Sequence, residues 1–308
     1  MEFNLVNIAI TVQTDNALGF QQCLPNLFRE FSSVFKGIAC RCPARVCDQC
    51  SGKENCAWFI VFGQKLSVDP DALKRHQKPP LPFVFSLPVL PETVENDIML
   101  ECGLVVIGRA IQYLEVFLEA FAGLLASDFC PVSAKVIQAG SRDFQGDVLP
   151  IANSYGIMRP EDLIVLSAEG LLESRTWSCS EFGIRFLSPV RLIENGRPLV
   201  RFDFNRFIRS LMRRVSALAY YYCEFEFDCD YKELSRQAET IVCTEDHFCQ
   251  AIGNNSKTNG ITGYGTFCGD VFGLMPFLIL GTYLHTGKAA SFGMGQYELL
   301  FHNAVNGS

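Results

Sequence analysis

Hydrophobic positions recur every second residue in some parts of the chain and at helical spacing in others. Residues 3–13, FNLVNIAITVQ, alternate between apolar and polar side chains and predict an opening strand. Residues 18–36 then place Phe20, Leu24, Leu27 and Phe31 on one side of a helix. The chain therefore begins with a strand followed by an amphipathic helix.

Further strands and a second helix follow a cysteine-rich stretch that ends at residue 56. The patterns predict strand character at AWFIVFGQ (57–64), PLPFVFSLPV (80–89) and DIMLECGLVVIG (97–108), with short strands at AKVIQAG (134–140) and IVLSAE (164–169). An amphipathic helix follows residue 108 and ends near 125. The predicted order is strand, helix, strands, helix, strand.

The same order of elements is predicted again from about residue 180 onward. The second set comprises a strand at 181–193, a helix over 203–222, a strand at 239–245, the glycine-studded segment 260–270, an apolar helix near 274–284 and a last strand at 296–301. Two helices that cover one face of a four-stranded antiparallel sheet account for each set.

The prediction is therefore an α+β fold with tandem ferredoxin-like (RRM-like) domains. The first domain spans 1–176 and carries a cysteine-rich zinc-knot insertion at 40–56, and the second spans 177–308. A doubly wound parallel sheet is the alternative, but G-x-G-x-x-G is absent after the first strand.

Composition and charge limit the function classes. The net charge is −7, so any nucleic-acid site must be local. The N-terminus lacks the basic and apolar regions of a secretory signal, and the longest apolar stretches are interrupted by charge or too short to span a membrane. We expect a cytoplasmic protein with no membrane partner.

Five of the fourteen cysteines fall within residues 40–56, CRCPARVCDQCSGKENC. Without an export signal a disulfide framework is not expected, and dense thiols in a polar segment suit tetrahedral Zn²⁺. Cys47, Cys50 and Cys56 are the firmer ligands, and either Cys40 or Cys42 is the fourth. Buried free thiols and an iron–sulfur cluster are the alternatives to this structural zinc.

Basic residues concentrate between 181 and 214, where eight arginines accompany three acidic residues. Arg206, Arg209 and Arg213 have the spacing of one helical face, which we call the arginine face, and Arg214 follows directly. A guanidinium group can bind phosphate through two parallel hydrogen bonds. This pattern predicts an RNA contact, although a solvated helix surface is the simpler alternative.

Nine glycines lie between residues 260 and 295. Residues 287–295, GKAASFGMG, form what we call the glycine loop, and its backbone amides could surround a phosphate chain through Gly287, Gly293 and Gly295. It does not match the nucleoside-triphosphate loop, because the glycine spacing differs and alanine follows Lys288.

Three segments of the C-terminal half resemble a known family: FLSPVRLIENGRPL…FDFNRFIRSLMRR (186–214), GITGYGTFCGD (260–270) and LGTYLHTGKAASFGMGQY (280–297). They are similar to the CRISPR-associated endoribonucleases that process precursor CRISPR RNA, which are RAMP-superfamily members and form the Cas family numbered six. The first half resembles a branch with a four-cysteine knot, which favours Cys40, Cys47, Cys50 and Cys56 as ligands.

The resemblance implies a function and a mechanism. Enzymes of this family cleave repeat RNA without a catalytic metal: the 2′-hydroxyl attacks the adjacent phosphate and leaves a 2′,3′-cyclic phosphate and a 5′-hydroxyl. Such chemistry needs a base, an acid and a cation. His285 and Lys288 match the family's His-x-Gly-Lys run, Tyr297 is a further catalytic candidate, and Lys257 is a further RNA contact.

The expected partners are precursor CRISPR RNA and other CRISPR effector subunits. The alternative function on the same fold is a non-cleaving RNA-binding RAMP subunit of an effector complex. A packed His285 that shapes the glycine loop without moving a proton is the simpler reading of that residue. A zinc-knotted interaction module outside RNA biology leaves the arginine face and the glycine loop unexplained.

Overall fold

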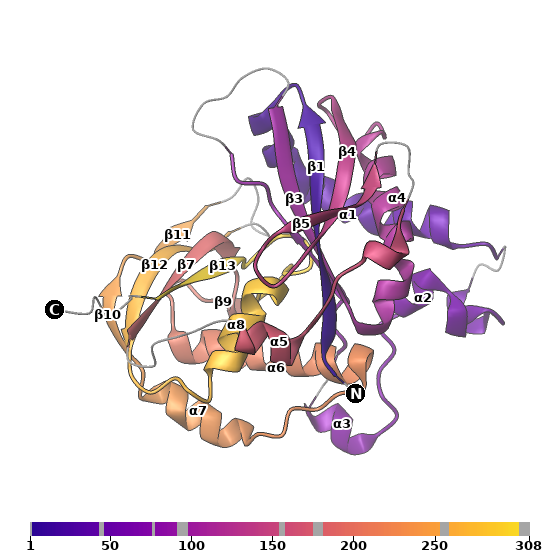
Figure 1. Ribbon diagram of the computed structural model, residues 1–308. Coiled ribbons are helices and arrows are strands. Elements are labelled where there is room, and N and C mark those ends of the chain that lie inside the picture. Colours follow the sequence, from indigo (N-terminus) through magenta and orange to yellow (C-terminus); the bar gives the residue numbers. More distant parts are fainter. Residues whose placement is uncertain are drawn as a thin grey trace.

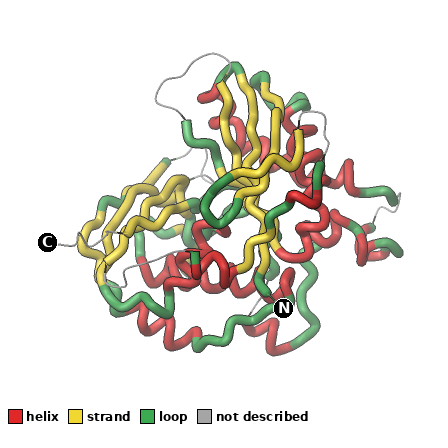
Figure 2. Tube along the Cα trace, in the orientation of Figure 1, coloured by secondary structure: helices red, strands yellow, loops and turns green. Residues whose placement is uncertain are grey.

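Two antiparallel sheets, each with helices on one face, make up the protein (Figures 1 and 2). The computed structural model describes residues 2–42, 46–75, 78–90, 98–153, 158–174, 181–252 and 259–301. Figure 1 shows the N-terminal sheet in the upper part of the molecule and the C-terminal sheet at the left.

The first sheet is built around β1 (Asn4–Thr14), which pairs antiparallel with strands on both of its edges. Its apolar residues alternate along the strand, so one face is buried against helices. The strand order is β2-β3-β1-β4-β5, with β6 also paired to β1. The other strands are β2 (Phe83–Ser86), β3 (Ile98–Ile107), β4 (Ala134–Arg142), β5 (Val148–Asn153) and β6 (Val165–Ser167).

Helices α1 (Ala17–Ala39) and α4 (Leu114–Leu125) share a core with the first sheet. The side chain of Asn16 caps the start of α1 by accepting a hydrogen bond from the Gly19 amide at 2.8 Å. Phe31 is fully buried and lies among a group of phenylalanine rings: Phe35, Phe62, Phe83, Phe85 and Phe117. These rings contribute much of the apolar area that fixes the helices on the sheet.

The second sheet has the order β10-β12-β7-β13, with β11 also paired to β12. Helix α6 (Phe204–Cys223) starts at Asp203, whose carboxylate accepts a hydrogen bond from the Arg206 amide at 2.8 Å. Its apolar side packs with α8 (Met275–Leu284) in one core. The strands are β7 (Glu181–Val190), β10 (Val242–Asp246), β11 (Cys249–Ala251), β12 (Gly260–Cys268) and β13 (Tyr297–Phe301).

Both units follow the order strand, helix, strand, strand, helix, strand. In the first these are β1, α1, β2, β3, α4 and β4, and in the second β7, α6, β10, β12, α8 and β13. The first strand of each unit lies between its third and fourth strands in the sheet. This is the connectivity of a ferredoxin-like unit, and the antiparallel pairing excludes the doubly wound alternative for these sheets.

One predicted strand is wrong. Residues AWFIVFGQ were expected to be extended, but α2 (Ala57–Phe62) is a helix that contacts α1 and places Ala57 and Val61 in the first core. A short, continuously apolar run does not distinguish a strand from a buried helix.

The structure adds several short elements to the predicted ones. They are α3 (Pro70–Arg75), α5 (Ala168–Glu173), α7 (Tyr231–Glu239), the hairpin β8 (Ile193–Glu194) and β9 (Arg197–Pro198), and four 3₁₀ turns at Cys47–Gln49, Lys53–Asn55, Gly108–Tyr113 and Pro160–Asp162. The predicted boundary at residue 176 lies outside the described residues. None of the helices in the described ranges is long and apolar enough to cross a membrane.

Candidate functional site

The glycine loop connects α8 to β13 in the C-terminal unit and contacts strand β2 of the N-terminal unit. The Phe85 amide donates a hydrogen bond to the Ser291 carbonyl at 3.0 Å, and Phe85 and Phe292 form a parallel bridge. The Phe292 ring meets the Phe83 ring edge-on at 5.7 Å. The loop therefore joins the two units.

Hydrogen bonds inside the protein occupy many of the loop's backbone amides. The Lys288 amide donates to the Arg191 carbonyl and the Gly295 amide to the Pro189 carbonyl, both at 2.9 Å. The amides of Phe292, Gly293 and Met294 donate to carbonyls within the loop. Among the residues described, the amides of Gly287, Ala289, Ala290 and Ser291 have no such partner. Ala290 and Ser291 are buried, so the amides of Gly287 and Ala289 are the ones accessible to a phosphate.

The glycine at position 295 is required by a close backbone approach. Its φ is +68°, and a Cβ atom there would lie 1.9 Å from the Thr286 carbonyl oxygen. Only glycine accommodates that contact. This glycine therefore shapes the loop, whatever it binds.

His285 is buried at the end of α8, with 1% of its surface exposed. Its Nε2 lies 3.3 Å from the Ser86 hydroxyl of β2. Burial, and to a lesser extent the nearby positive charge of Arg214, lower the pKa of the imidazole to about 3, so the ring is neutral at pH 7. In this arrangement His285 connects the two units.

Arg214 holds the glycine loop from the side of α6. Its Nε donates to the Leu284 carbonyl at 2.8 Å and its Nη2 to the Ser291 hydroxyl at 3.2 Å. Burial lowers the pKa of this guanidinium to about 10, so it stays protonated at neutral pH. The positive charge lies at the C-terminus of α8, where it also interacts favourably with the helix dipole.

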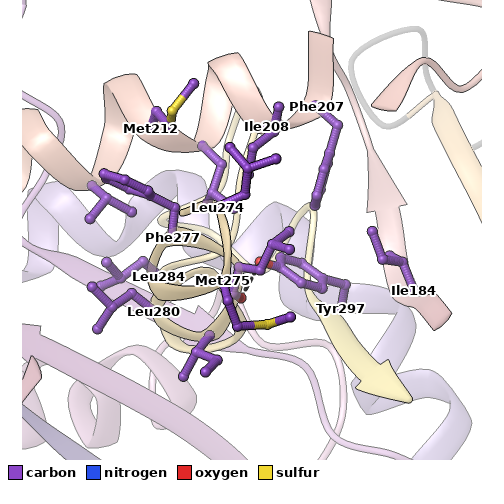
Figure 3. Close-up of a cluster of buried hydrophobic side chains, with 14 of the residues drawn as sticks. Ile184, Phe207, Ile208, Met212, Leu274, Met275, Phe277, Leu280, Leu284 and Tyr297 are labelled. Carbon is purple, nitrogen blue, oxygen red and sulfur yellow. Dashed lines mark hydrogen bonds between the residues drawn. The ribbon is translucent and has the colours of Figure 1, made fainter. Parts of the chain in front are cut away.

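The two other residues predicted to act with His285 lie in different surroundings. Lys288 is exposed on the loop. Tyr297 is buried between α6 and α8, as Figure 3 shows, and its hydroxyl donates to the Leu278 carbonyl at 2.6 Å. The structure thus brings His285 and Lys288 to one loop, whereas the ring of Tyr297 is part of the core. Their catalytic assignment stays a prediction.

The arginine face lies on the solvent side of α6, and all three of its residues are exposed. Arg206 forms an ion pair with Glu194 of the β8–β9 hairpin, and the Arg213 Nε donates to the Arg209 carbonyl at 3.2 Å. On the same helix Ser210 contacts Thr286 beside the loop, with 3.3 Å between the hydroxyls. The arginine face therefore adjoins the loop. The remaining candidate, Lys257, lies outside the described residues.

The predicted cysteine ligands line one surface depression together with Trp58 and Tyr113. The Gly52 backbone lowers the pKa of the Cys50 thiol by hydrogen bonding, but the neighbouring thiols of Cys42 and Cys56 contribute to a net rise. The thiol in contact with Cys50 thus belongs to Cys42, the alternative fourth ligand. Within the described ranges, no three His, Cys, Asp or Glu side chains are arranged so that they could bind one metal ion together.

The sequence did not predict Ser86 as a partner of His285. It also did not distinguish Arg214, which bonds to the glycine loop, from the exposed arginine face. Ser86 lies 199 residues from its partner His285, so no local pattern connects the two. For Arg214 a signal exists, because it sits one position beyond the exposed i, i+3, i+7 pattern and turns toward the core.

Two parts of the chain match models of known protein families. Residues 184–297 match the model of the CRISPR-associated endoribonuclease Cas6 family, and residues 3–138 match a model described as the AF_1859 N-terminal domain. No curated protein matches the chain.

Solved structures share the fold over nearly the whole chain. Thermus thermophilus Cas6 has a TM-score of 0.55 at 13% identity and covers 97% of this chain and 100% of its own. A Cas6 product complex gives 0.56 at 17% identity, with 96% and 100% covered. A partial Cas6-RT-Cas1–Cas2 complex gives 0.56 at 12% identity and covers 100% of this chain and 47% of its own. At such identities the likeness concerns the fold.

Replacing His285 with Gln should change how stability depends on pH. The ring is neutral when folded and titrates near pH 6.5 when unfolded, so below pH 6.5 the unfolded state binds the extra proton. Wild-type stability should therefore fall from pH 6.5 toward pH 3, with His285 contributing up to about 1.4 kcal/mol per pH unit. The Gln variant should lack this part of the slope.

Urea unfolding at half-unit pH steps measures the free energy of unfolding for both proteins. His247→Gln is the matched control, because His247 is exposed and should leave the slope unchanged. Parallel curves for wild type and His285→Gln would contradict a buried neutral imidazole.

Proposed function

We propose that this chain, whose residues 184–297 match the Cas6 family, is a CRISPR RNA-processing endoribonuclease that binds and cuts precursor repeat RNA. The family match carries the proposal, and the ferredoxin-like order of both units supports it. The solved relatives include a Cas6 product complex, which supports RNA as the ligand.

RNA would bind along the surface formed by the arginine face and Lys288. Arg209 and Arg213 are exposed, and Thr286, directly before the glycine loop, touches α6 between them at Ser210. The amides of Gly287 and Ala289 flank Lys288 and could contact one phosphate. Lys288 would neutralise the phosphate that is attacked.

The proposed reaction is attack of a 2′-hydroxyl on the adjacent phosphate. The new bond from O2′ to phosphorus forms as the bond to the 5′-oxygen breaks, and a proton passes from the 2′-hydroxyl to a base while the 5′-oxygen gains one. His285 and Tyr297 remain candidates for these proton transfers, but both are buried in the absence of RNA. Direct participation would need the loop to open when RNA binds.

The burial of His285 also favours the alternative function, a non-cleaving RNA-binding subunit. The histidines within the described ranges are His247 and His285, and the second is neutral and bonded to Ser86. A protein that holds its RNA by cations and amides needs no titrating group. Other CRISPR proteins would then be partners, as in the Cas6-RT-Cas1–Cas2 structure.

Cutting of an end-labelled repeat RNA in EDTA tests the main proposal. We expect one cut that leaves a 2′,3′-cyclic phosphate and a 5′-hydroxyl, because the internal 2′-hydroxyl is the nucleophile. An RNA with a single 2′-deoxynucleotide at the cut position should bind equally and stay intact. Binding without cutting would favour the alternative, and cutting of the deoxy RNA would exclude the mechanism.

Salt dependence tests the arginine face. The double variant Arg209→Ala, Arg213→Ala should weaken binding to all RNA sequences similarly and reduce the slope of log affinity against log salt by about 1 per arginine. Arg236→Ala on α7 is the control, because Arg236 is equally exposed but pairs with Glu233. An unchanged slope in the double variant would place the RNA elsewhere.

We further propose that the cysteine cluster holds one structural zinc ion. Cys40, Cys42, Cys47, Cys50 and Cys56 line the same depression, and a bound ion would take up their thiols as thiolates. Cys47, Cys50 and Cys56 are common to both predicted ligand sets. The contact of Cys42 with Cys50 supports Cys42 as the fourth ligand, and the family spacing supports Cys40.

Native mass spectrometry should find one zinc ion per chain and none in Cys50→Ser. The exposed thiol of Cys249 lies on β11, so Cys249→Ser should keep the metal. Free zinc at 1,000 times its Kd should raise the free energy of unfolding by about 4 kcal/mol in wild type. A wild-type protein without zinc, or zinc retained by Cys50→Ser, would contradict the site.

A further inference from the structure

The open face of the C-terminal sheet carries an exposed pair of rings. Residues of β7 that point to the helices, such as Phe182 and Ile184, are buried, whereas Arg185 is exposed on the other face. Arg185 lies between Tyr264 on β12 and Glu298 on β13 in the register of the sheet. Tyr264 is 43% exposed, which is high for an aromatic ring in the middle of a sheet.

The second ring belongs to His247, at the end of β10. Its centroid lies 4.6 Å from that of Tyr264, with 31° between the ring planes. The His247 amide donates to the Tyr264 carbonyl at 2.9 Å, which fixes the two residues side by side. Both residues are accessible to solvent, so the pair presents a preformed aromatic surface.

The backbone beside Tyr264 is shaped to bring His247 this close. Gly263 has a φ of +106°, and a Cβ atom there would lie 2.2 Å from the His247 carbonyl oxygen. Any other side chain would push the two strands apart and separate the rings. The sequence GITGYGTF thus builds the ring pair, a role that sequence reasoning did not assign.

The charges around the rings suit a neutral, planar ligand better than a phosphate. Arg185 forms an ion pair with Glu298 at 3.0 Å, and Glu245 and Asp246 lie on the adjacent strand β10. Every nucleobase has a neutral π face, and stacking on aromatic side chains does not require a particular sequence. The phosphates would therefore be held elsewhere while a base covers the rings.

Strand β7 runs from this surface to the glycine loop. Arg191 lies six positions after Arg185, which is roughly 20 Å along a strand, and its carbonyl accepts a hydrogen bond from the Lys288 amide. An RNA bound at the loop could reach the rings within a few unpaired nucleotides. A ligand that bound the rings alone would not need to reach the glycine loop.

We propose that Tyr264 and His247 form a stacking platform for an unpaired base of the bound RNA. This inference rests on the proposed function, because the base belongs to the RNA held at the arginine face and the glycine loop. The platform supplies affinity and orients a single-stranded part of the RNA, and it takes no part in bond breaking.

Binding of repeat RNA to Tyr264→Ala, Tyr264→Phe and His247→Ala tests the platform. Loss of one stacked base should weaken binding by roughly tenfold in Tyr264→Ala, while the Phe variant should bind like wild type. Phe272→Ala is the matched control, because Phe272 is 68% exposed in the turn before α8 and should not alter affinity. Thermal unfolding of each variant confirms that it is folded.

RNAs that carry 2-aminopurine at successive unpaired positions give a second readout. At one position the fluorescence should be quenched on binding to wild type and recover in Tyr264→Ala. Equal RNA affinity and equal fluorescence in wild type and Tyr264→Ala would overturn the platform and leave the proposed function intact. A wild-type protein that binds no RNA would overturn both.

Discussion

The contact between the glycine loop and strand β2 adds polar, directional bonds to the apolar core that the two units share. The Phe85 amide and the Ser291 carbonyl form a hydrogen bond across the junction, and His285 faces Ser86 beside it. Buried polar groups are expensive unless they are paired, so this junction favours one arrangement of the units over many. Arg214 anchors the same loop to α6, which couples the junction to the helix that carries the arginine face.

The residues near this junction fall into two groups: those that build the loop and those that are exposed to a ligand. His285, Gly295 and Arg214 make their contacts inside the protein, although each belongs to a type that often binds phosphate. Lys288 and the arginine face point to solvent. A glycine-rich sequence beside a histidine therefore has a structural explanation that is independent of catalysis, and any catalytic use of His285 would disturb the junction.

The sequence predicts the sheets and the long helices because each has one buried and one exposed face. The alternation in β1 and the spacing of Phe20, Leu24 and Phe31 in α1 follow directly from that asymmetry. It fails for α2, which is apolar throughout, and for α7, which is short and mostly polar and buries only Leu234 and Ala238. The surroundings of His285 could not be predicted, because burial there depends on a strand about 200 residues away.

The distribution of charge bears on which surfaces would contact RNA under the proposed function. The whole chain carries −7, so it repels nucleic acid except where arginines concentrate. Exposed cations lie on α6 and the glycine loop, whereas the edge strand β10 carries Glu245 and Asp246. Under the proposed function, the phosphate backbone of the RNA would be attracted to the α6 side of the C-terminal unit. RNA contacts on the open sheet face would then come from bases, since an acidic edge repels phosphate but does not oppose stacking.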